Sequence, residues 1–370
     1  MAMIIKNVTL THVRVPLVEP FRISSGAVAE KDGIVVRIDT SDSTGFGESS
    51  PMAGSFYSSD TPDSCWSELR ERIVPSLLQE KFSSPLAGAE WISGTGGSNF
   101  AKTGVETALW DLEARQRNMP LHRLLGGSDG PVESGLAVGL YADVGDLLRA
   151  IEKYLADGYK RVKIKIERGH DLELVRAVRG EFGNIPLFVD ANGAYDMSDL
   201  PVFQALDDFG LMMFEQPFPG SMLPELAALQ RQVKTPVCLD ESLESENDVK
   251  QAIALGSMRI ANIKVQRVGG FGPALRLYEL CKNANIPVWV GTMPELGIGQ
   301  VQGMAFASLP HCSFPTDVEA SARWFRDDII SPWLDVKDGC LNLSPAPGLG
   351  FEVVESKLAQ YAVRTETFQA

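Results

Sequence analysis

The sequence predicts an α/β protein in which a parallel eight-stranded barrel follows a smaller α+β domain. From residue 134 onward, short apolar runs alternate with helical stretches, which is the pattern of a parallel sheet covered by helices. Five of these runs end in an ionisable residue, and the five residues follow one another at intervals of 24 or 25 positions. The first 60 residues show instead the alternation of antiparallel strands, and a length of 370 residues suggests more than one core.

Composition excludes several classes of protein. The chain is 44% hydrophobic and 22% charged, as in globular proteins, and no apolar run approaches the roughly 18 residues of a membrane span. A net charge of −14 argues against nucleic acid as a partner, but it permits an anionic substrate in a locally positive pocket. The five cysteines are scattered without a CxxC pair, and the N-terminus lacks a signal-peptide run. We therefore expect a reduced, cytoplasmic protein with no membrane partner.

The N-terminal region is expected to form antiparallel strands. Residues 4–15 alternate apolar and polar side chains, and residues 33–38 are expected to pair with residues 45–48 across a short polar turn. Two stretches, 21–30 and 51–60, are rich in small, polar or turn-forming residues and are expected to be loops. These loops either lie on the surface or act as lids over a site.

Helices follow in the same domain. Residues 63–78 have helical spacing, although Pro75 is expected to bend or end this helix. Residues 101–117 predict a cleaner helix, and residues 121–127 close the domain with a pair of glycines. We expect three parts: an α+β domain with lid loops at 1–128, a catalytic barrel at 129–329, and a C-terminal segment at 330–370 that returns to the first domain.

The barrel is predicted from eight short strands separated by helices. The expected strands are 135–140, 160–166, 185–189, 211–214, 236–239, 259–264, 286–290 and 312–315. The expected helices are 144–157, 172–182, 201–209, 223–233, 246–255, 273–284 and 296–309. In a closed parallel barrel the loops at the carboxyl ends of the strands carry the chemistry. An open doubly wound sheet is the alternative, but it would not bring five consecutive strand ends around one point.

Three acidic residues, Asp190, Glu215 and Asp240, end successive strands. Carboxylate oxygens without nearby histidine or cysteine favour Mg²⁺ or Mn²⁺ over zinc, and they leave open positions for water and substrate. Each acid alone could simply cap the next helix. Three carboxylates that converge at one end of a barrel repel one another unless a cation lies between them, so we expect a divalent metal site.

Lysines lie on both sides of these acids. Residues 162–166 alternate apolar and cationic side chains, so Lys163 and Lys165 point to the same face, whereas Lys264 ends the sixth strand. The second and sixth strands of a closed barrel are opposite, so Lys165 and Lys264 are expected to flank the metal. Burial, the metal and Lys163 would lower the pKa of these lysines. That suits proton abstraction beside a carboxylate, while the metal stabilises the enediolate. The alternative for Lys163 is a solvated charge at the rim.

Further polar residues follow the metal-site acids. Asn192 and Glu241 are expected to orient ligands or substrate, although Asn192 is equally suited to capping a helix. The segment 269–272, Gly-Gly-Phe-Gly, precedes a helix. It favours a turn, with an anion cradle at the helix N-terminus as the alternative.

The motifs around these residues resemble those of the enolase superfamily, in particular its muconate-lactonizing subgroup. The motifs are Lys163-Ile164-Lys165, Asp190-Ala191-Asn192, Phe214-Glu215-Gln216-Pro217, Leu239-Asp240-Glu241-Ser242 and Asn262-Ile263-Lys264. The resemblance covers nearly the whole chain. It implies a modified TIM barrel, (β/α)7β, with an N-terminal α+β capping domain whose loops near Arg22 and Phe56 are lids. It also implies lysine acid–base chemistry with Mg²⁺.

Other segments resemble those of the o-succinylbenzoate synthase and N-succinylamino acid racemase families. They are 267–270, 291–299 and, together with Asp317, 320–325. Met293, Glu295 and Asp317 are therefore expected beside the metal or the substrate. Val265-Gln266 stands where these families usually have Pro-Gly, and Pro294 interrupts their motif for the seventh strand.

We therefore expect an isomerase or carbon–oxygen lyase that uses Mg²⁺ to remove the α-proton of a small carboxylate. The expected enzyme is an N-succinylamino acid (N-acylamino acid) racemase, an o-succinylbenzoate synthase, or both. In a racemase, Lys165 and Lys264 act as base and acid on opposite faces; in a dehydration, Lys165 transfers the protons and Lys264 stabilises the enolate. Alternatives with the same mechanism are a muconate-type cycloisomerase and a dipeptide epimerase, the latter suggested by the acidic pair Asp317 and Glu319. A non-catalytic barrel that binds a metal or a small acid is the alternative of another class. We also expect a homo-oligomer.

Overall fold

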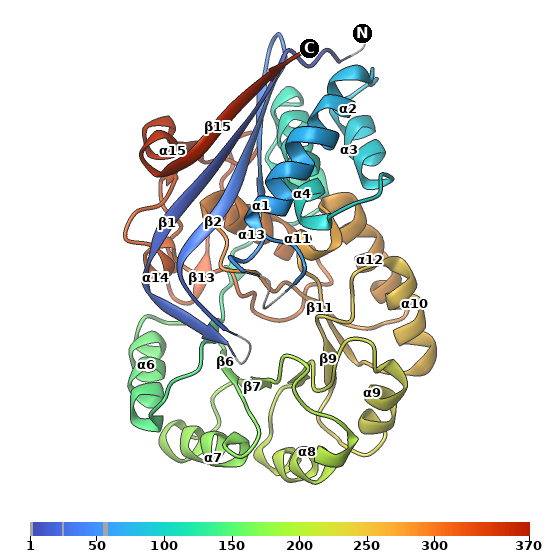
Figure 1. The fold of residues 1–370 in the computed structure, drawn as a ribbon. Coiled ribbons are helices and arrows are strands. Elements are labelled where there is room, and N and C mark those ends of the chain that lie inside the picture. Colours follow the sequence, from blue (N-terminus) through green and yellow to red (C-terminus); the bar gives the residue numbers. More distant parts are fainter. Residues whose placement is uncertain (1–2, 24–25, 55–57) are drawn as a thin grey trace.

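The computed structural model describes the chain except for residues 1–2, 24–25 and 55–57. An antiparallel sheet with its own helices stands above a parallel sheet that is surrounded by helices (Figure 1). The combination of a parallel barrel and an antiparallel α+β domain is confirmed. Within the described residues, no helix is long and apolar enough to cross a membrane.

The antiparallel sheet has the strand order β15–β1–β2–β3. Its strands are β1 (Asn7–Ile23), β2 (Gly26–Asp39), β3 (Thr44–Ser49) and β15 (Ala362–Gln369). The predicted pairing of the second and third strands is confirmed, with Ile34 opposite Ser49 and Asp39 opposite Thr44. The chain end forms β15, which pairs antiparallel with β1. The domain limits at 128 and 329 stay a prediction.

The hairpin of β1 and β2 is longer than predicted. The expectation of a loop over residues 21–30 is wrong, because Phe21 pairs with Val28 and Ile23 pairs with Gly26. Small residues have a weak preference for strands, and pairing with the neighbouring strand overrides it. The hairpin extends from the antiparallel sheet to the region of β6 (Figure 1). In the second expected loop, Phe56 lies outside the described residues.

Helices of the same domain follow β3. They are α1 (Pro62–Glu68), α2 (Val74–Gln79), α3 (Pro85–Ser93), α4 (Asn99–Gln116) and α5 (Leu121–Leu125). A π-helical turn, Leu69–Ile73, joins α1 to α2, so the helix does not end at Pro75, but its regular α-helical pattern is interrupted just before the proline. The wider turn changes the hydrogen-bond pattern just before the proline. The missing N–H of Pro75 then falls in the first turn of α2, where it is tolerated.

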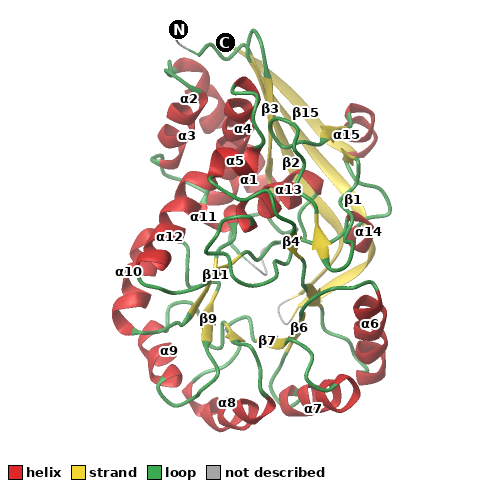
Figure 2. Cartoon of the chain, turned by 180° about the vertical axis from the view of Figure 1, so that it is seen from behind, coloured by secondary structure: helices red, strands yellow, loops and turns green. Residues whose placement is uncertain are grey.

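Seven parallel strands form a curled sheet in which each strand pairs with the next along the chain (Figure 2). They are β5 (Leu136–Val138), β6 (Val162–Lys165), β7 (Leu187–Asp190), β8 (Phe214–Glu215), β9 (Val237–Leu239), β10 (Ile260–Asn262) and β11 (Val288–Trp289). The helices that surround them are α6 (Val144–Ala156), α7 (Asp171–Phe182), α8 (Leu200–Leu206), α9 (Leu223–Gln230), α10 (Glu246–Leu255), α11 (Val265–Val268), α12 (Phe271–Asn283) and α13 (Gly297–Ala307). The predicted alternation is confirmed, with shorter strands.

The prediction of an eighth strand at 312–315 is wrong, because this segment makes only isolated bridges to its neighbours. Cys312 makes one isolated bridge to β11, and Thr316 makes one to Ser134 ahead of β5. Pro315 lies between them and has no N–H to donate to a ladder. The buried guanidinium of Arg161 donates to Pro315 O at 2.7 Å and lies 2.8 Å from Asp317. Single contacts of the segment 312–317 therefore connect the two edges of the curled sheet.

The remaining short elements follow or precede the barrel. They are β4 (Val132–Glu133), α14 (Ser321–Trp324), β12 (Ile330–Ser331), β13 (Cys340–Leu341), β14 (Glu352–Val353) and α15 (Glu355–Tyr361). A separate buried cluster packs between the parallel strands, formed by Phe188, Met213, Cys238, Ile260 and Trp289. Arg161 lies 4.8 Å above the ring of Phe188 and 5.2 Å above that of Trp289. This apolar cluster lies beneath the carboxyl ends of the parallel strands.

Candidate active site

Strand register brings the predicted ionisable residues to one edge of the parallel sheet. Lys165 lies opposite Asp190, and Asp190 lies opposite Glu215, on three adjacent strands. Asp240 directly follows β9, and Lys264 follows β10 by two residues. All five side chains are buried, from 0% exposure for Glu215 to 8% for Lys165. Their positions at successive carboxyl ends follow from the regular spacing in the sequence.

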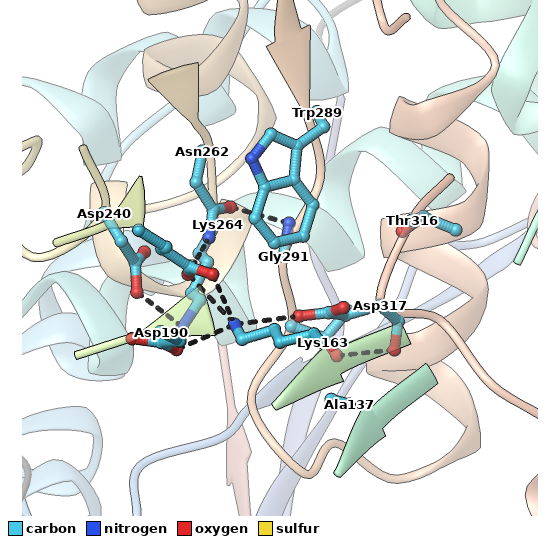
Figure 3. Close-up of polar contacts among 12 residues, drawn as sticks. Ala137, Lys163, Asp190, Asp240, Asn262, Lys264, Trp289, Gly291, Thr316 and Asp317 are labelled. Carbon is cyan, nitrogen blue, oxygen red and sulfur yellow. Dashed lines mark hydrogen bonds and ion pairs between the residues drawn. The ribbon is translucent and has the colours of Figure 1, made fainter. Parts of the chain in front are cut away.

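Lys163 lies at the centre of this cluster (Figure 3). Its Nζ is 2.9 Å from Asp190 Oδ2, 2.8 Å from Glu215 Oε2 and 3.3 Å from Asp317 Oδ2. Burial alone would lower the pKa of Lys163. The carboxylates of Asp190, Asp317 and Glu215 outweigh burial and hold the pKa well above its usual value. Lys163 is thus a buried, charged group and not a solvated charge at the rim.

Hydrogen bonds of Asn262 connect β10 to Glu215 on β8 and to Gly291 after β11. Burial and the adjacent Asp190 carboxylate raise the pKa of Glu215 to about 8. Glu215 Oε1 accepts a hydrogen bond from Asn262 Nδ2 at 3.0 Å, and Asn262 Oδ1 accepts one from Gly291 N at 2.7 Å. A Cβ at position 291 would come within 2.5 Å of Asn262, so the contact requires glycine. Asn262 is not among the predicted site residues. Its position two residues before Lys264, on the same strand face, was the available signal.

Lys165 is held by the next strand and the loop that follows it. Its Nζ lies 2.5 Å from Asp190 Oδ2 and 2.8 Å from Asn192 Oδ1. The backbone N–H of Asn192 donates to Asp190 Oδ1 at 2.9 Å, and its side-chain Nδ2 donates to Glu241 Oε1 at 2.9 Å. Asn192 therefore links Lys165 to two acidic residues, and its role in orienting ligands or substrate stays a prediction.

Lys264 contacts Asp240 from the other side of the cluster. Lys264 Nζ lies 2.9 Å from Asp240 Oδ2, and the guanidinium of Arg267 forms an ion pair with Asp240 Oδ1. Burial would raise the pKa of Asp240, but the charges of Arg267 and Lys264 outweigh it and lower the pKa to about 2. Arg267 lies on α11, which begins directly after Lys264. Two cations thus fix the orientation of this acid.

The chemistry of the three acids fits a divalent cation. Asp190, Glu215 and Asp240 offer only hard carboxylate oxygens, and the ammonium of Lys163 between Asp190 and Glu215 marks a point that favours positive charge. Each acid contacts a basic side chain in the structure. Over residues 3–23, 26–54 and 58–370, no group of three or more His, Cys, Asp or Glu has the geometry to hold a metal ion.

A cavity lies beside these residues. Its lining comprises Phe21, Met52, Ala137, Lys163, Lys165, Asn192, Lys264, Thr292, Met293, Pro294, Asp317 and Trp324. Met293 and Asp317 thus line it, whereas Glu295 is buried behind it and accepts a hydrogen bond from Met293 N at 3.0 Å. Phe21 and Met52 come from the two segments interpreted as loops or lids. The lining of the cavity thus combines three lysines with several apolar side chains.

The acidic pair Asp317 and Glu319 already has partners within the chain. Asp317 lies close to Lys163 and to Arg161, both buried. Glu319 Oε1 accepts a hydrogen bond from Ala137 N at 2.7 Å, and its Oε2 lies 3.6 Å from Arg323 Nε. The two carboxylates therefore do not combine to present negative charge to the cavity.

The glycine-rich segment 269–272 forms a turn whose backbone N–H groups bind a carboxylate of the same chain. Gly269 and Gly270 have φ values of +97° and +118°, which favour glycine. The carboxylate of Glu106, from α4, accepts hydrogen bonds from Phe271 N at 2.8 Å and Gly272 N at 2.7 Å. The helix N-terminus is therefore occupied by an internal carboxylate.

Comparison with known proteins places this geometry in a family. Residues 5–126 match the model of the mandelate racemase/muconate lactonizing enzyme N-terminal domain, and residues 146–357 match the enolase C-terminal domain-like model. An o-succinylbenzoate synthase from Bacillus subtilis is 39% identical over 98% of both chains. An N-succinylamino acid racemase from an Amycolatopsis species is 39% identical over 94% of both.

Solved structures agree with the sequence relatives. A member of the enolase superfamily from Listeria innocua has a TM-score of 0.94 at 34% identity and covers 99% of both chains. A muconate lactonizing enzyme from Pseudomonas fluorescens, solved with muconolactone, has a TM-score of 0.91 at 26% identity and covers 98% of this chain and 100% of its own. The chain therefore belongs to the mandelate racemase/muconate lactonizing enzyme family of the enolase superfamily.

Proposed function

We propose that this protein removes and returns the α-proton of a small N-acylated amino acid, and that its reaction is racemisation of an N-succinylamino acid. One observation carries the proposal: the amines of Lys165 and Lys264 line one cavity, from strand positions separated by the three acid-bearing strands β7, β8 and β9. A carbanion held between two amines can be protonated on either face, which is what racemisation requires.

We infer that Asp190, Glu215 and Asp240 hold Mg²⁺, with Mn²⁺ as the alternative. When bound, the ion would stabilise the negative charge that develops on the substrate carboxylate as the α-proton leaves. Enzymes of this family are generally dependent on divalent metals, which supports the inference together with the all-oxygen donor set. The ammonium of Lys163 provides a further positive charge in the lining of the cavity.

Lys165 and Lys264 share the proton transfer in this proposal. The neutral amine of one lysine takes the α-proton, and the ammonium group of the other donates a proton to the opposite face. Asn192 and Asp190 orient Lys165, and Asp240 orients Lys264. The two lysines exchange roles when the reaction runs in the opposite direction.

The apolar side chains that line the cavity suit the side chain of an amino acid. Phe21 and Trp324 pack edge to face with ring centroids 5.1 Å apart, and Met52 and Met293 are buried beside the cavity. Methionine side chains adapt to different shapes, so we propose that several apolar side chains are accepted. The name of the Amycolatopsis relative supports an N-succinyl substituent on the substrate.

Synthesis of o-succinylbenzoate is the second candidate, favoured by the 39% identity to the Bacillus subtilis enzyme of that name. In that dehydration Lys165 would move the protons and Lys264 would stabilise the developing charge. The internal partners of Asp317 and Glu319 argue against a dipeptide epimerase, which would need free negative charge for a substrate ammonium.

We further propose a cytoplasmic homo-oligomer. The five cysteines at 65, 238, 281, 312 and 340 are free thiols, which is consistent with a reducing compartment. Sedimentation velocity of the purified protein tests the oligomer, and a single monomeric species would contradict it.

Proton NMR in D₂O tests the proposed function. The protein is incubated with Mg²⁺ and the separate enantiomers of N-succinyl derivatives of apolar amino acids, with dipeptides as a comparison set. We expect the α-proton signal to disappear and the optical rotation to decay for the N-succinyl compounds. Lys165→Met/Lys264→Met is the control for exchange that does not depend on the site. Unchanged α-proton signals for every N-succinyl compound would contradict racemisation.

A further inference from the structure

The N-cap residues of the barrel helices α12 and α13 provide no side-chain cap. The first N–H groups of a helix need acceptors, and a side chain at the N-cap position usually provides one. Asp143 does so for α6 and Ser245 for α10. The N-cap residues of α12 and α13 are Gly270 and Leu296, and neither makes a side-chain cap. Carboxylates of the N-terminal domain accept from both helices, and at α13 the carboxylate of Asp328 also accepts from Gly297 N at 3.0 Å.

Glu106 of α4 caps α12. Its two oxygens accept hydrogen bonds from Phe271 N and Gly272 N at 2.8 and 2.7 Å, and Trp110 Nε1 also donates to it at 2.9 Å. The side chain of Glu106 is fully buried. A Cβ at Gly270 would come within 2.2 Å of Glu106 Oε2, so the close approach of the two domains depends on glycine there.

Glu48 of β3 caps α13 in the same way. Its oxygens accept hydrogen bonds from Leu296 N at 2.9 Å and from Gly299 N at 2.8 Å. The hydroxyl of Ser50 donates to Glu48 at 2.5 Å, and the carboxylate is fully buried. The backbone that leads into α13 includes Thr292 to Pro294, which line the cavity.

The short helix α11 between these two caps is also fixed by the N-terminal domain. Gln266 donates to Glu48 O at 2.9 Å and accepts from Ser50 N at 3.0 Å. Thr103 donates to the carbonyl of Gln266, and Asn99 donates to that of Arg267. Because α11 begins directly after Lys264, these contacts fix the backbone from which this lysine projects. Figure 2 shows α11 and α13 at the junction of the two domains.

The Lys165 side of the cavity is held differently. The hydrogen bonds of Lys165 go to Asp190 and Asn192, and Asn192 in turn contacts Glu241. All four residues lie at the carboxyl ends of barrel strands or in the loops that follow them. Both lysines contact a barrel acid, but the backbone that follows Lys264 is also held by the N-terminal domain, whereas the contacts of Lys165 lie within the barrel.

We propose that Glu48 and Glu106 are positioning residues of the N-terminal domain, which cap α13 and α12 and thereby hold Lys264, but not Lys165, in place for proton transfer. The inference rests on the proposed racemisation. A racemase separates the two lysines experimentally, because each enantiomer presents its α-proton to one of them. Exchange with retention reports the facing lysine alone, whereas racemisation requires both.

The test compares Glu106→Ala and Glu48→Ala with the wild-type protein, using both enantiomers of one N-succinylamino acid in D₂O. We expect racemisation to fall about 10- to 100-fold, the cost of a small misplacement of a reacting group. One enantiomer should still exchange its α-proton with retention near the wild-type rate, and exchange from the other should fall with racemisation. Glu106→Gln, which keeps one acceptor oxygen, should restore part of the loss.

Glu113→Ala is the matched control. Glu113 lies on the same helix as Glu106 and forms an ion pair with Arg117 within that helix. This variant loses a buried carboxylate of α4 without touching the barrel caps, so it should keep both exchange rates. Equal losses for both enantiomers in Glu106→Ala and Glu48→Ala would show a general structural defect and would overturn the positioning role. Unchanged racemisation in both variants would overturn it as well.

A measurement without substrate separates this inference from the proposed function. Amide hydrogen exchange followed by mass spectrometry should show faster exchange across residues 265–275 in Glu106→Ala, but not in Glu113→Ala. Wild-type protein that exchanges no α-proton would contradict the proposed function only. Unaltered amide exchange at 265–275 in Glu106→Ala would overturn the positioning role, whatever the substrate.

Discussion

The two sides of the reaction cavity are built on different principles. On the side of Lys165, strands β6, β7 and β8 pair in register, and side-chain ion pairs join Lys163 and Lys165 to Asp190 and Glu215. On the side of Lys264, hydrogen bonds from the N-terminal domain hold the backbone of α11, α12 and α13. The first side is local to the barrel, and the second depends on how two domains dock.

Because the two sides are held by different contacts, we expect substitutions on one side to have different effects from substitutions on the other. A change within β6 to β8 should alter Asp190, Glu215 and Lys165 together, because ion pairs of Lys163 and Lys165 connect these side chains. A change at the domain junction should alter the position of Lys264, of the loop with Met293 and of Asp240, which pairs with Lys264 and Arg267, but should leave Asp190 and Glu215 in place. Stereochemistry and substrate fit can thus respond to the domain junction without loss of the charge cluster.

Substitution of each lysine in turn should have the largest effect and tests whether the two sides serve opposite faces of the substrate. Lys165→Met should abolish α-proton exchange from one enantiomer, and Lys264→Met from the other, each by about 10³-fold or more, because the proton acceptor itself is lost. Both variants should stop racemisation. NMR of each enantiomer in D₂O measures the effect. Loss of exchange from the same enantiomer in both variants would show that the amines do not serve opposite faces.

Asn192→Ala sharpens the comparison on the barrel side. Asn192 contacts Asp190, Glu241 and Lys165, so its loss should weaken the apparent affinity for Mg²⁺ about 10- to 100-fold. Gln266→Ala, on the other side, should shift that affinity much less, because the hydrogen bonds of the Gln266 side chain go to Glu48 and Ser50 and not to an acid of the cluster. Activity as a function of Mg²⁺ concentration measures both. Equal shifts in the two variants would contradict the separation of the two sides.

On the side of Lys264, the buried carboxyl group of Glu295 should make the stability of the protein depend on pH. Burial and the charge of Glu48 raise the pKa of Glu295 to about 8, well above its value in the unfolded chain. The folded state therefore binds more protons between pH 4.5 and 8, so stability should fall as pH rises through this window. Glu295→Gln should remove up to about 1.4 kcal/mol of this loss for each pH unit. Urea unfolding at several pH values measures it, and parallel profiles for both proteins would count against a raised pKa.

We expect the smallest effect when the N-cap residue of a helix that caps itself is replaced. Ser245 caps α10 with its own side chain, so Ser245→Ala should lower the free energy of unfolding by about 1 kcal/mol without altering racemisation. Glu48→Ala, which removes a cap from the other domain, should lower both stability and racemisation. Thermal unfolding and polarimetry decide this. A fall in racemisation for Ser245→Ala as large as that for Glu48→Ala would remove the distinction between the two kinds of cap.

The Lys165 side of the cavity could be predicted from the sequence because its residues recur at a regular interval along the chain. Parallel strands place their carboxyl ends at one edge, so residues spaced by one strand–helix unit, such as Lys165, Asp190 and Glu215, meet there. Asn192 was also predicted, since it lies two residues after Asp190, an acid of this series. Alternation along a short strand was enough to place Lys163 beside Lys165.

The domain junction could not be predicted, because nothing local marks its contacts. Glu106 lies 165 positions before its hydrogen-bond donor Phe271, and Glu48 lies 251 positions before its donor Gly299. Non-local pairing also explains the wrong loop at 21–30, where the neighbouring strand overrides weak local preference. The irregular edge at 312–315 depends on contacts made by Arg161 from another strand end.

A crystal structure with Mg²⁺ and an N-succinylamino acid tests the central claim most directly. We predict density for one cation bound by Asp190, Glu215 and Asp240, and a substrate α-carbon between the amines of Lys165 and Lys264. Density that leaves these acids paired only with lysines and arginine, or a substrate whose α-carbon lies away from both amines, would contradict the account.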